Sequence, residues 1–394
     1  MKAGWNREKL GDVCDLLNRG ISPKYLEKCG IRVLNQKCIR NHQVNYEQSR
    51  RHDDATKTVN ENRLIKLGDV LVNSTGTGTL GRVAQVREDT TEPTTVDSHV
   101  TIVRPKHEKF FPNFFGYMLI DIEEHIKESG EGCGGQTELA RSVLAEKFFV
   151  SYPNSIAEQK RIVAILDQAF ESIAIAKANA EQNLKNAREL FESHLQSVFM
   201  RGGKNWKMER LDALTHLSRG HNPPKSKFST EYKLGYVRFY QIRDGSSDDY
   251  TVYVPDTPQL HKMKKDDIMM VAYRHVGRVF RGVEGAFNVA LCKISNVRRD
   301  LLDDDYLFHV MPSSFVKGEL LKRSERSLIP SMSIEHLKEL KIPLPPIKDQ
   351  IGIVNLFNFL QTQTQNLESI YQQKIAALNE LKKSLLHKAF NGEL

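Results

Sequence analysis

Two groups of basic and polar residues are the part of this sequence that could do chemistry. Arginine, asparagine and glutamine side chains can make paired hydrogen bonds to purine edges, and lysine can bind phosphate. Any one such residue is more often a solvated surface charge, but the two groups stand at matching places in two halves of the chain. We therefore predict that they bind DNA. The first group is Arg19, Ser22, Lys24, Gln36, Lys37, Arg40, Ser74, Thr75, Thr77, Thr79 and Arg82. The second group is Arg219, Asn222, Lys225, Lys227, Gln241, Arg243, Tyr273, Arg274, His275 and Arg278.

Two short motifs resemble those of enzymes without completing them. Gly76-Thr77-Gly78-Thr79-Leu80-Gly81 has the glycine spacing of a dinucleotide site, but such a site requires a helix directly after it. The following residues predict a strand, so we interpret the segment as a hairpin loop. Asn222-Pro223-Pro224-Lys225 resembles the Asn-Pro-Pro-aromatic motif of amino-methyltransferases, with lysine in place of the ring that stacks on the flipped base. The histidines show no metal-site spacing. We predict no catalytic residue and no metal site.

The composition limits the kinds of partner. The chain has 394 residues and a formal net charge of +8, which favours an acidic partner such as nucleic acid. No apolar run approaches the roughly 18 residues that span a membrane, so we expect no membrane association. The cysteines show no Cys-x-x-Cys spacing, and reduced thiols in a cytoplasmic protein are the expectation.

Two long helices organise the chain. Residues 155–200 and 346–394 each carry apolar residues at alternating steps of four and three, and the first range contains neither proline nor glycine. Gln159 aligns with Gln350 and Phe199 with Phe390 at one offset (350 − 159 = 390 − 199 = 191), which indicates an internal duplication. We expect the helices to form an antiparallel coiled coil. The predicted seam and partner-docking residues are Ile162, Leu166, Ile173, Leu190, Ile353, Phe357, Leu360, Leu367, Leu378 and Leu381.

Two globular regions alternate with these helices. Residues 1–154 and 201–345 contain short β-branched runs separated by turn residues, together with helical segments, which predicts an α+β class for both. Landmarks recur: Trp206 corresponds to Trp5, and Gly277-Arg278-Val279 to Gly81-Arg82-Val83. The loops between the landmarks differ in content. We expect two related domains that recognise different targets.

Taken together, these features resemble the specificity (S) subunits of type I restriction–modification enzymes. The resemblance covers nearly the whole chain and rests on Leu67-Gly68-Asp69-Val70-Leu71, on Leu80-Gly81-Arg82-Val83 and on the entry to the second helix, Pro343-Leu344-Pro345-Pro346-Ile347-Lys348-Asp349-Gln350. The family usually has Glu before this Gln. The entry to the first helix departs further, since it retains only Pro153.

The resemblance implies a non-catalytic subunit with two target-recognition domains, each reading half of a bipartite site in double-stranded DNA. It also implies that the helices set the spacing and dock two methyltransferase subunits, and that the full complex adds two restriction subunits. S-adenosylmethionine, ATP and Mg²⁺ would then be bound by those partners, and this chain would bind no cofactor. Two alternatives stay open: a free-standing adenine-methyltransferase-like enzyme that uses Asn222-Pro223-Pro224, and a coiled-coil scaffold that binds DNA.

Overall fold

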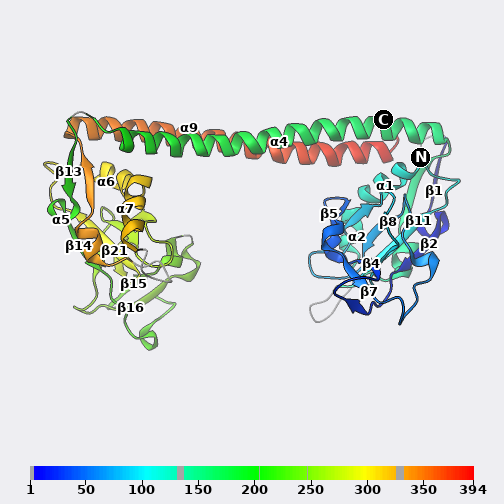
Figure 1. Cartoon of the computed structure of the whole chain (residues 1–394), viewed down its shortest axis with the longest axis horizontal. Helices are drawn as coiled ribbons and strands as arrows, with labels where there is room; N and C mark the ends of the chain where they lie inside the picture. The colour runs from blue at the N-terminus through cyan, green and yellow to red at the C-terminus, as the bar shows by residue number, and fades with distance from the viewer. Residues whose placement is uncertain (1–3, 131–136, 204, 246, 325–331) are drawn as a thin grey trace. The chain divides into compact units, whose positions relative to one another are not determined.

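A computed structural model describes residues 4–130, 137–203, 205–245, 247–324 and 332–394. The chain divides into two compact units: Met1–Glu181 with Gln373–Leu394, and Gln182–Gln372. Each unit contains one domain of mixed helices and strands and parts of two long helices (Figure 1). The predicted α+β class is confirmed. No helix among the described residues is long and apolar enough to cross a membrane.

The core sheet of the first domain has the strand order β2-β11-β8-β9, with antiparallel pairs throughout. Successive side chains of a strand point to opposite faces, and β8 is buried on both. Val70 and Val72 join the core that contains the phenylalanines of helix α1, whereas Leu71 joins a second core with Leu34. The elements of this layer are β2 (Cys14–Arg19), β8 (Val70–Asn73), β9 (Val83–Gln85), β11 (Val100–Pro105), α1 (Pro112–Asp121), α2 (Glu123–Glu128) and α3 (Arg141–Glu146).

A second sheet covers the other face of β8. Its order is β10-β4-β7-β3, and the pair of β10 with β4 is parallel. A small hairpin of β5 and β6 follows β4 along the chain. These strands are β3 (Tyr25–Leu26), β4 (Ile31–Leu34), β5 (Ile39–Arg40), β6 (Gln43–Val44), β7 (Arg50–His52) and β10 (Thr94–Val96).

The second domain repeats this frame. Its core sheet has the order β14-β21-β18-β19, and β18 is buried on both faces: Ile268 and Met270 join one core, Met269 and Val271 another. Its second sheet, β16-β15-β20-β17, also contains one parallel pair, β15 with β20. The edges differ: β3 extends the sheet beside β7 in the first domain, whereas β17 lies beside β20 in the second. The strands are β14 (Thr215–Arg219), β15 (Tyr236–Tyr240), β16 (Val252–Pro255), β17 (Lys262–Met263), β18 (Ile268–Val271), β19 (Val279–Arg281), β20 (Gly285–Phe287) and β21 (Leu291–Asn296). The helices are α5 (Leu211–Leu214), α6 (Asp304–Val310), α7 (Ser314–Ser324) and α8 (Ile334–Lys338).

The long helices are α4 (Ile156–Arg201) and α9 (Ile347–Phe390). Each begins just after the last strand of a domain, β12 (Phe149–Pro153) or β22 (Lys341–Leu344). These strands pair with the first strands of their domains, β1 (Trp5–Lys9) and β13 (Lys207–Arg210). The chain therefore enters each helix from a two-stranded ribbon that also holds the start of the same domain.

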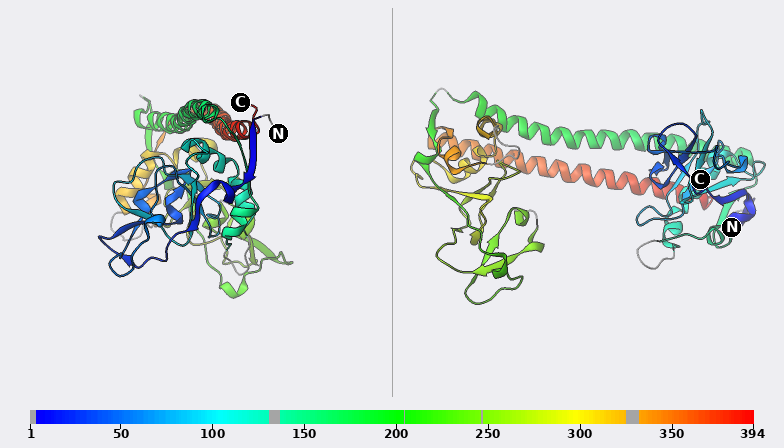
Figure 2. Two further views of the ribbon diagram at one scale, coloured as in Figure 1. Left: turned by 90° about the vertical axis from the view of Figure 1, so that its right-hand side faces the viewer. Right: turned by 60° about the horizontal axis from the view of Figure 1, so that its bottom comes forward.

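The two helices pair in antiparallel fashion within each unit, as predicted. In the first unit, Arg161 donates to the carbonyl of Leu394 at 2.7 Å, and Lys177 donates to Asn379 at 3.3 Å. In the second unit, the Arg188 guanidinium lies 2.5 Å from the Glu368 carboxylate. Within the first unit, the partner of the later α4 residue thus comes from the earlier part of α9, and the paired helix segments lie side by side (Figures 1 and 2).

The predicted seam is correct in part. Ile162, Leu166, Ile173 and Phe357 are buried, and Ile353, Leu360 and Leu378 are half-buried. Leu190, Leu367 and Leu381 are instead 61%, 42% and 47% exposed, so their placement in the seam was wrong. The half-buried positions are the next residues, Phe191, Glu368 and Lys382. The prediction places a seam residue every 3.5 residues, whereas a straight helix has 3.6 residues per turn. After several turns the predicted position therefore lies one residue before the position that faces the partner helix.

A buried glutamine joins each long helix to its domain. Gln159 donates to the carbonyls of Lys109 and Pro153, both at 2.9 Å, and accepts from the Phe111 N–H at 2.8 Å. Gln350 makes the same three kinds of bond with Leu301, Pro345 and Asp303, at 2.7 to 2.8 Å. Both side chains are fully buried. Because all six partners are backbone groups, the connection does not depend on which side chains surround it.

Replacing Gln350 by Leu should lower the free energy of unfolding by at least about 2 kcal/mol, because one N–H and two carbonyls lose their buried partner. Urea denaturation of the full-length chain measures the change. Gln363→Leu, at an exposed position of α9, is the matched control and should stay within about 0.5 kcal/mol of the wild type. Equal unfolding midpoints for the two variants would contradict the assigned role.

Candidate nucleic-acid interface

The hairpin loops after β8 and β18 place two predicted arginines at equivalent positions. Asn73 N–H donates to the Arg82 carbonyl at 2.9 Å, and Val271 N–H donates to the Arg278 carbonyl at 2.8 Å. The glycines before these arginines, Gly81 and Gly277, both have a left-handed backbone, with φ of +79° and +88°. Arg82 and Arg278 are therefore the first residues after equivalent glycine turns in the two domains. The loops that precede them differ by two residues in length, 74–81 against 272–277.

The glycine-rich loop of the first domain is a hairpin tip. Strand β9 follows it at Val83, so no helix N-terminus lies where a pyrophosphate would bind, which agrees with the interpretation from sequence. In the second domain the corresponding tip carries Arg274 in the left-handed region, at φ +64°. Its guanidinium lies 5.7 Å from the Tyr273 ring centroid.

Five predicted residues of the first domain surround one cavity of about 470 Å³, which we call the Gln36 cavity. Its floor is tied together by hydrogen bonds: Thr79 Oγ1 donates to Gln36 Oε1 at 2.8 Å, and the Asn73 amide donates to the carbonyls of Gln36 and Thr79, both at 3.1 Å. Lys37 and Arg40 are exposed at its rim. The cavity thus combines amides, hydroxyls and cations, the groups that contact base edges and phosphates. The predicted residues that line it are Gln36, Lys37, Arg40, Thr77 and Thr79.

Asn45 and Gln48 also line the Gln36 cavity and were absent from the prediction. Asn45 caps a short 3-10 helix, Tyr46–Gln48, by accepting from the Glu47 N–H at 2.9 Å. No local pattern marks them, because only the β5–β6 hairpin folds this helix back beside Gln36 and Lys37.

A second cavity, of about 450 Å³, adjoins the first at Arg40 and is lined by Arg82, His42, Glu123 and Lys127; we call it the Arg82 cavity. Arg82 donates to the Gly78 carbonyl at 2.8 Å. Burial favours the neutral form of Glu123, but hydrogen bonds from His42 and Lys127 outweigh it, so the pKa of this carboxyl is lowered. Glu123 therefore carries a negative charge, which lies 2.5 Å from the Lys127 ammonium and 3.2 Å from His42 Nε2.

The predicted residues of the second domain are placed as follows. Lys225 and Lys227 are exposed in a 3-10 helix, and Arg274, His275 and Arg278 are exposed in the β18–β19 hairpin. Arg243 is exposed and lies 5.3 Å from the Tyr250 ring centroid. Gln241 and Tyr273 are half-buried. The carbonyl oxygen of Asn222 accepts from the Val289 N–H at 3.1 Å.

Three predicted DNA contacts are engaged inside the protein. Ser74 is fully buried, and its hydroxyl is hydrogen-bonded to that of Thr101. Arg19 binds Glu138 and donates to the Leu139 carbonyl at 2.7 Å. Arg219, at the equivalent end of β14, donates to the carbonyls of Val289 and Met332 at 2.8 and 3.0 Å. We correct Ser74 to a structural role; Arg19 and Arg219 also have structural contacts, and their part in DNA binding stays a prediction.

Arg19 and Arg219 make equivalent contacts in the two domains. Leu139 N–H donates to the Ser74 carbonyl and Met332 N–H to the Ala272 carbonyl, both within 2.9 Å. The segments that lead to α3 and α8 therefore lie on the same point of each frame, where Arg19 and Arg219 hold them. Sequence matching correctly paired Arg19 with Arg219 and did not predict these contacts within the protein.

The remaining predicted residues of the first domain lie outside the cavities described above. Ser22 and Lys24 are exposed before β3, and the Ser22 carbonyl accepts from Lys57 at 2.8 Å. Thr75 is half-buried, with its hydroxyl 2.6 Å from His99 Nδ1. Among the described residues, no group of three or more His, Cys, Asp or Glu could hold a metal ion.

Comparison with known proteins supplies the decisive observation. The family model for the type I restriction modification DNA specificity domain matches twice, over residues 2–186 and 203–379. The chain belongs to this family. Each match contains one of the two globular domains and most of the long helix that follows it.

Individual members of the family are distant in sequence. The MjaVIII specificity subunit of Methanocaldococcus jannaschii is 24% identical over 197 residues, which cover 48% of this chain and 43% of that one. The chain thus aligns with less than half the length of this relative. The HsdS subunit from Thermoanaerobacter tengcongensis has the same fold, with a TM-score of 0.62 and 20% identity over 100% of this chain and 98% of that one. A chain from a structure of type I restriction–modification complex assembly and conformational transition has a TM-score of 0.80 and 19% identity, over 100% and 99%.

Replacing Arg19 by Ala should lower the free energy of unfolding by about 1.5 to 3 kcal/mol, since charged hydrogen bonds to Glu138 and Leu139 are lost. Urea denaturation measures the change. Lys37→Ala, at an exposed residue of the same domain, should unfold like the wild type. An Arg19→Ala variant of unchanged stability but weaker DNA binding would show that Arg19 acts in DNA binding and not in holding the frame.

Proposed function

We propose that this chain is the DNA-specificity subunit of a type I restriction–modification complex, and that each domain reads one half of a bipartite DNA site. The observation that carries the proposal is the repetition of one frame with unlike loops. The frame keeps Arg82 and Arg278 at the same turn, while the tip before them is Thr and Gly in one domain and Tyr, Arg and His in the other. Equivalent positions with different side chains suit two readers of different base sequences.

In this proposal, exposed lysines bind the DNA backbone, and amide, hydroxyl and guanidinium groups recognise the bases. Lys37, Lys225 and Lys227 are exposed and neutralise backbone phosphates, which gives affinity without base preference. The Gln36 cavity and the Arg278 loop present the amide, hydroxyl and guanidinium groups that distinguish base pairs.

The test of the function is methylation mapping of the host genome with and without this gene. A bipartite methylated motif that disappears with the gene supports the proposal. The methyltransferase alternative gains nothing from the structure: Asn222 is bonded to the Val289 backbone, and Lys225 stands where the methyltransferase motif has an aromatic ring. Methyl transfer by the purified chain alone would nevertheless favour an enzyme.

We further propose that the long helices dock the methyltransferase subunits, and that the catalytic and cofactor-binding residues belong to the partners. Helix α9 supports this proposal with a second apolar stripe, separate from its seam. Leu356, Phe359, Leu367 and Ile370 are all exposed at spacings of three and eight, which places them on one helical face. Contiguous exposed apolar residues of this kind mark protein contacts. In the complete complex, two methyltransferase and two restriction subunits would bind S-adenosylmethionine, ATP and Mg²⁺ in the cytoplasm.

Replacing Arg278 by Ala should relax base choice in one half-site and leave the other unchanged. A lost bidentate base contact costs about 1 to 3 kcal/mol of discrimination. Competition binding with duplexes altered in each half-site measures this. Arg298→Ala, which removes an exposed arginine paired with Asp300 in the same domain, should leave both half-sites unaffected. Equal losses at both half-sites with Arg278→Ala would contradict the picture of two independent readers.

Replacing Phe359 by Asp should weaken binding of the methyltransferase subunit by roughly thirtyfold, because a charge in an apolar contact costs about 2 kcal/mol or more. Titration of the partner onto the purified chain measures the affinity. Gln365→Asp introduces the same charge at an exposed position on another face of α9 and serves as the control. Loss of DNA base preference with intact assembly would count against the docking role.

A further inference from the structure

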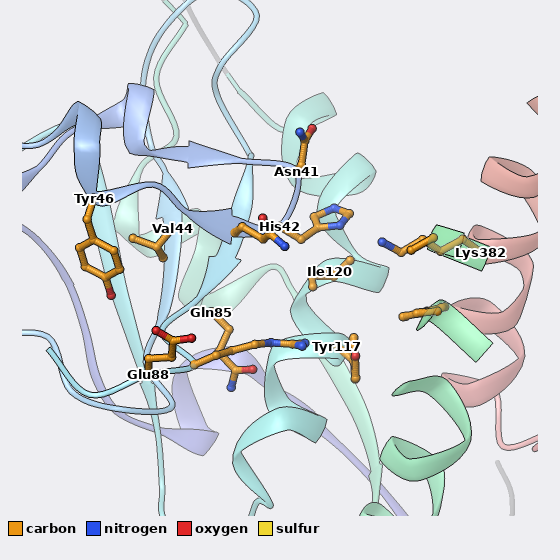
Figure 3. Close-up of a pocket in the computed structure, with 13 residues that line it drawn as sticks. Asn41, His42, Val44, Tyr46, Gln85, Glu88, Tyr117, Ile120 and Lys382 are labelled. Atoms are coloured by element: carbon orange, nitrogen blue, oxygen red, sulfur yellow. The ribbon is translucent and has the colours of Figure 1, made fainter. Parts of the chain in front are cut away.

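A third cavity, of about 530 Å³, lies in the first unit where the β5–β6 hairpin approaches the long helices. It is lined by His42, Tyr117 and Arg87 of the domain, by Phe170 of α4 and by Lys382 of α9; we call it the Lys382 cavity. Figure 3 shows Lys382 extending from its helix toward His42 and Ile120, with Tyr46 and Glu88 on the opposite side. Its walls are thus partly aromatic and partly cationic.

Arg87 and Lys382 are the arginine and the lysine that line this cavity. No ion pair joins Arg87 or Lys382 to a carboxylate among the residues that the structure describes. Each lies over an aromatic ring instead: the Arg87 guanidinium is 4.8 Å from the Tyr117 centroid, and the Lys382 ammonium is 5.0 Å from the Phe170 centroid. Such contacts hold a cation in place, and Arg87 also donates a hydrogen bond to the Tyr117 side chain.

The arrangement is costly without an anion. Burial lowers the pKa of Lys382, the charges of Arg87 and Lys177 lower it further, and the charge of Glu123 opposes them in part. Like charges brought together in a partly buried site repel one another. The other charged groups that line the cavity do not remove this repulsion, because His42 is paired with Glu123 at 3.2 Å and Glu88 lies on the far side.

The Lys382 cavity continues the series of cavities described above. It shares Asn41 and His42 with the Arg82 cavity, which in turn shares Arg40 with the Gln36 cavity. Asn41 and His42 form the turn between β5 and β6 and both have left-handed backbones, at φ +52° and +61°. Two consecutive left-handed residues are the mark of a tight type I′ hairpin. This tight turn therefore lies where the three cavities adjoin. Each cavity contains basic side chains: Lys37 and Arg40 line the first, and Lys382 lines the third.

We propose that Arg87 and Lys382 bind a phosphate group, the chemistry that the DNA backbone and free nucleotides have in common. An arginine that can bind two oxygens and a lysine that supplies a point charge are the usual pair for this group. Where DNA is the source, the inference rests on the proposed function and adds to it: a residue of helix α9, far from the first domain in sequence, takes part in the DNA contact of that domain. Where the source is a free nucleotide, the site stands independently of DNA reading.

The experiment uses the full-length chain in four forms: wild type, Arg87→Gln, Lys382→Gln and the control Lys383→Gln. Lys383 is the next residue of α9, with a side chain 66% exposed and paired with Glu380. Calorimetric titration with inorganic phosphate and with ADP tests the free source. The salt dependence of duplex DNA binding tests the backbone source, because each lost phosphate contact reduces the slope of log K against log salt by about 0.9. Thermal melting of each variant verifies that it is folded.

Binding of phosphate or ADP that is lost in Arg87→Gln and Lys382→Gln but kept in Lys383→Gln supports a free nucleotide as the source. A salt slope reduced by about 0.9 in Lys382→Gln, with base preference kept, supports the DNA backbone. The proposal is overturned if both variants match the wild type in both measurements. The proposed function fails separately, if the wild type shows no sequence preference in its DNA binding.

Discussion

Two buried glutamines control how this chain turns from domain to helix. Gln159 and Gln350 each join the first turn of a long helix to three backbone groups of the preceding domain. A buried amide that satisfies backbone groups on two elements leaves little freedom between them. The orientation of each domain on its helix is therefore fixed by hydrogen bonds between a glutamine and main-chain atoms. The sequence of the recognition loops can change without altering these bonds.

Two repeated arginine pairs show how one duplicated frame supports both constancy and change. Arg19 and Arg219 are bonded to carbonyls of the segments before α3 and α8, and they preserve the frame. Arg82 and Arg278 leave the same turn in each domain, after tips of different length and content. Repetition of a residue thus indicates an equivalent place, whereas its contacts decide whether that place serves folding or recognition.

The sequence was sufficient for features that repeat and insufficient for those that depend on the fold. The apolar spacing correctly predicted two long helices, the 191-residue offset correctly predicted that they are duplicates, and β-branched runs correctly predicted the α+β class. The predicted seam was wrong at Leu190, Leu367 and Leu381, because the 3.6-residue turn of a straight helix does not keep a seven-residue repeat. Ser74 was misplaced because the burial of a hydroxyl in a loop depends on Thr101, a residue of another strand. Gln48 was missed because only a hairpin brings it to Gln36.

The C-terminal end of α9 forms part of the hydrophobic core of the first domain. Leu386, Ala389 and Phe390 are buried with Phe114 and Leu166, and the rings of Phe390 and Phe114 meet edge to face at 5.2 Å. The second unit, by contrast, is one continuous segment, Gln182–Gln372. During synthesis at about 5 to 20 residues per second, the first domain must wait roughly 10 to 40 s with part of its core uncovered. The second domain can close first, so the order of completion reverses the order of translation.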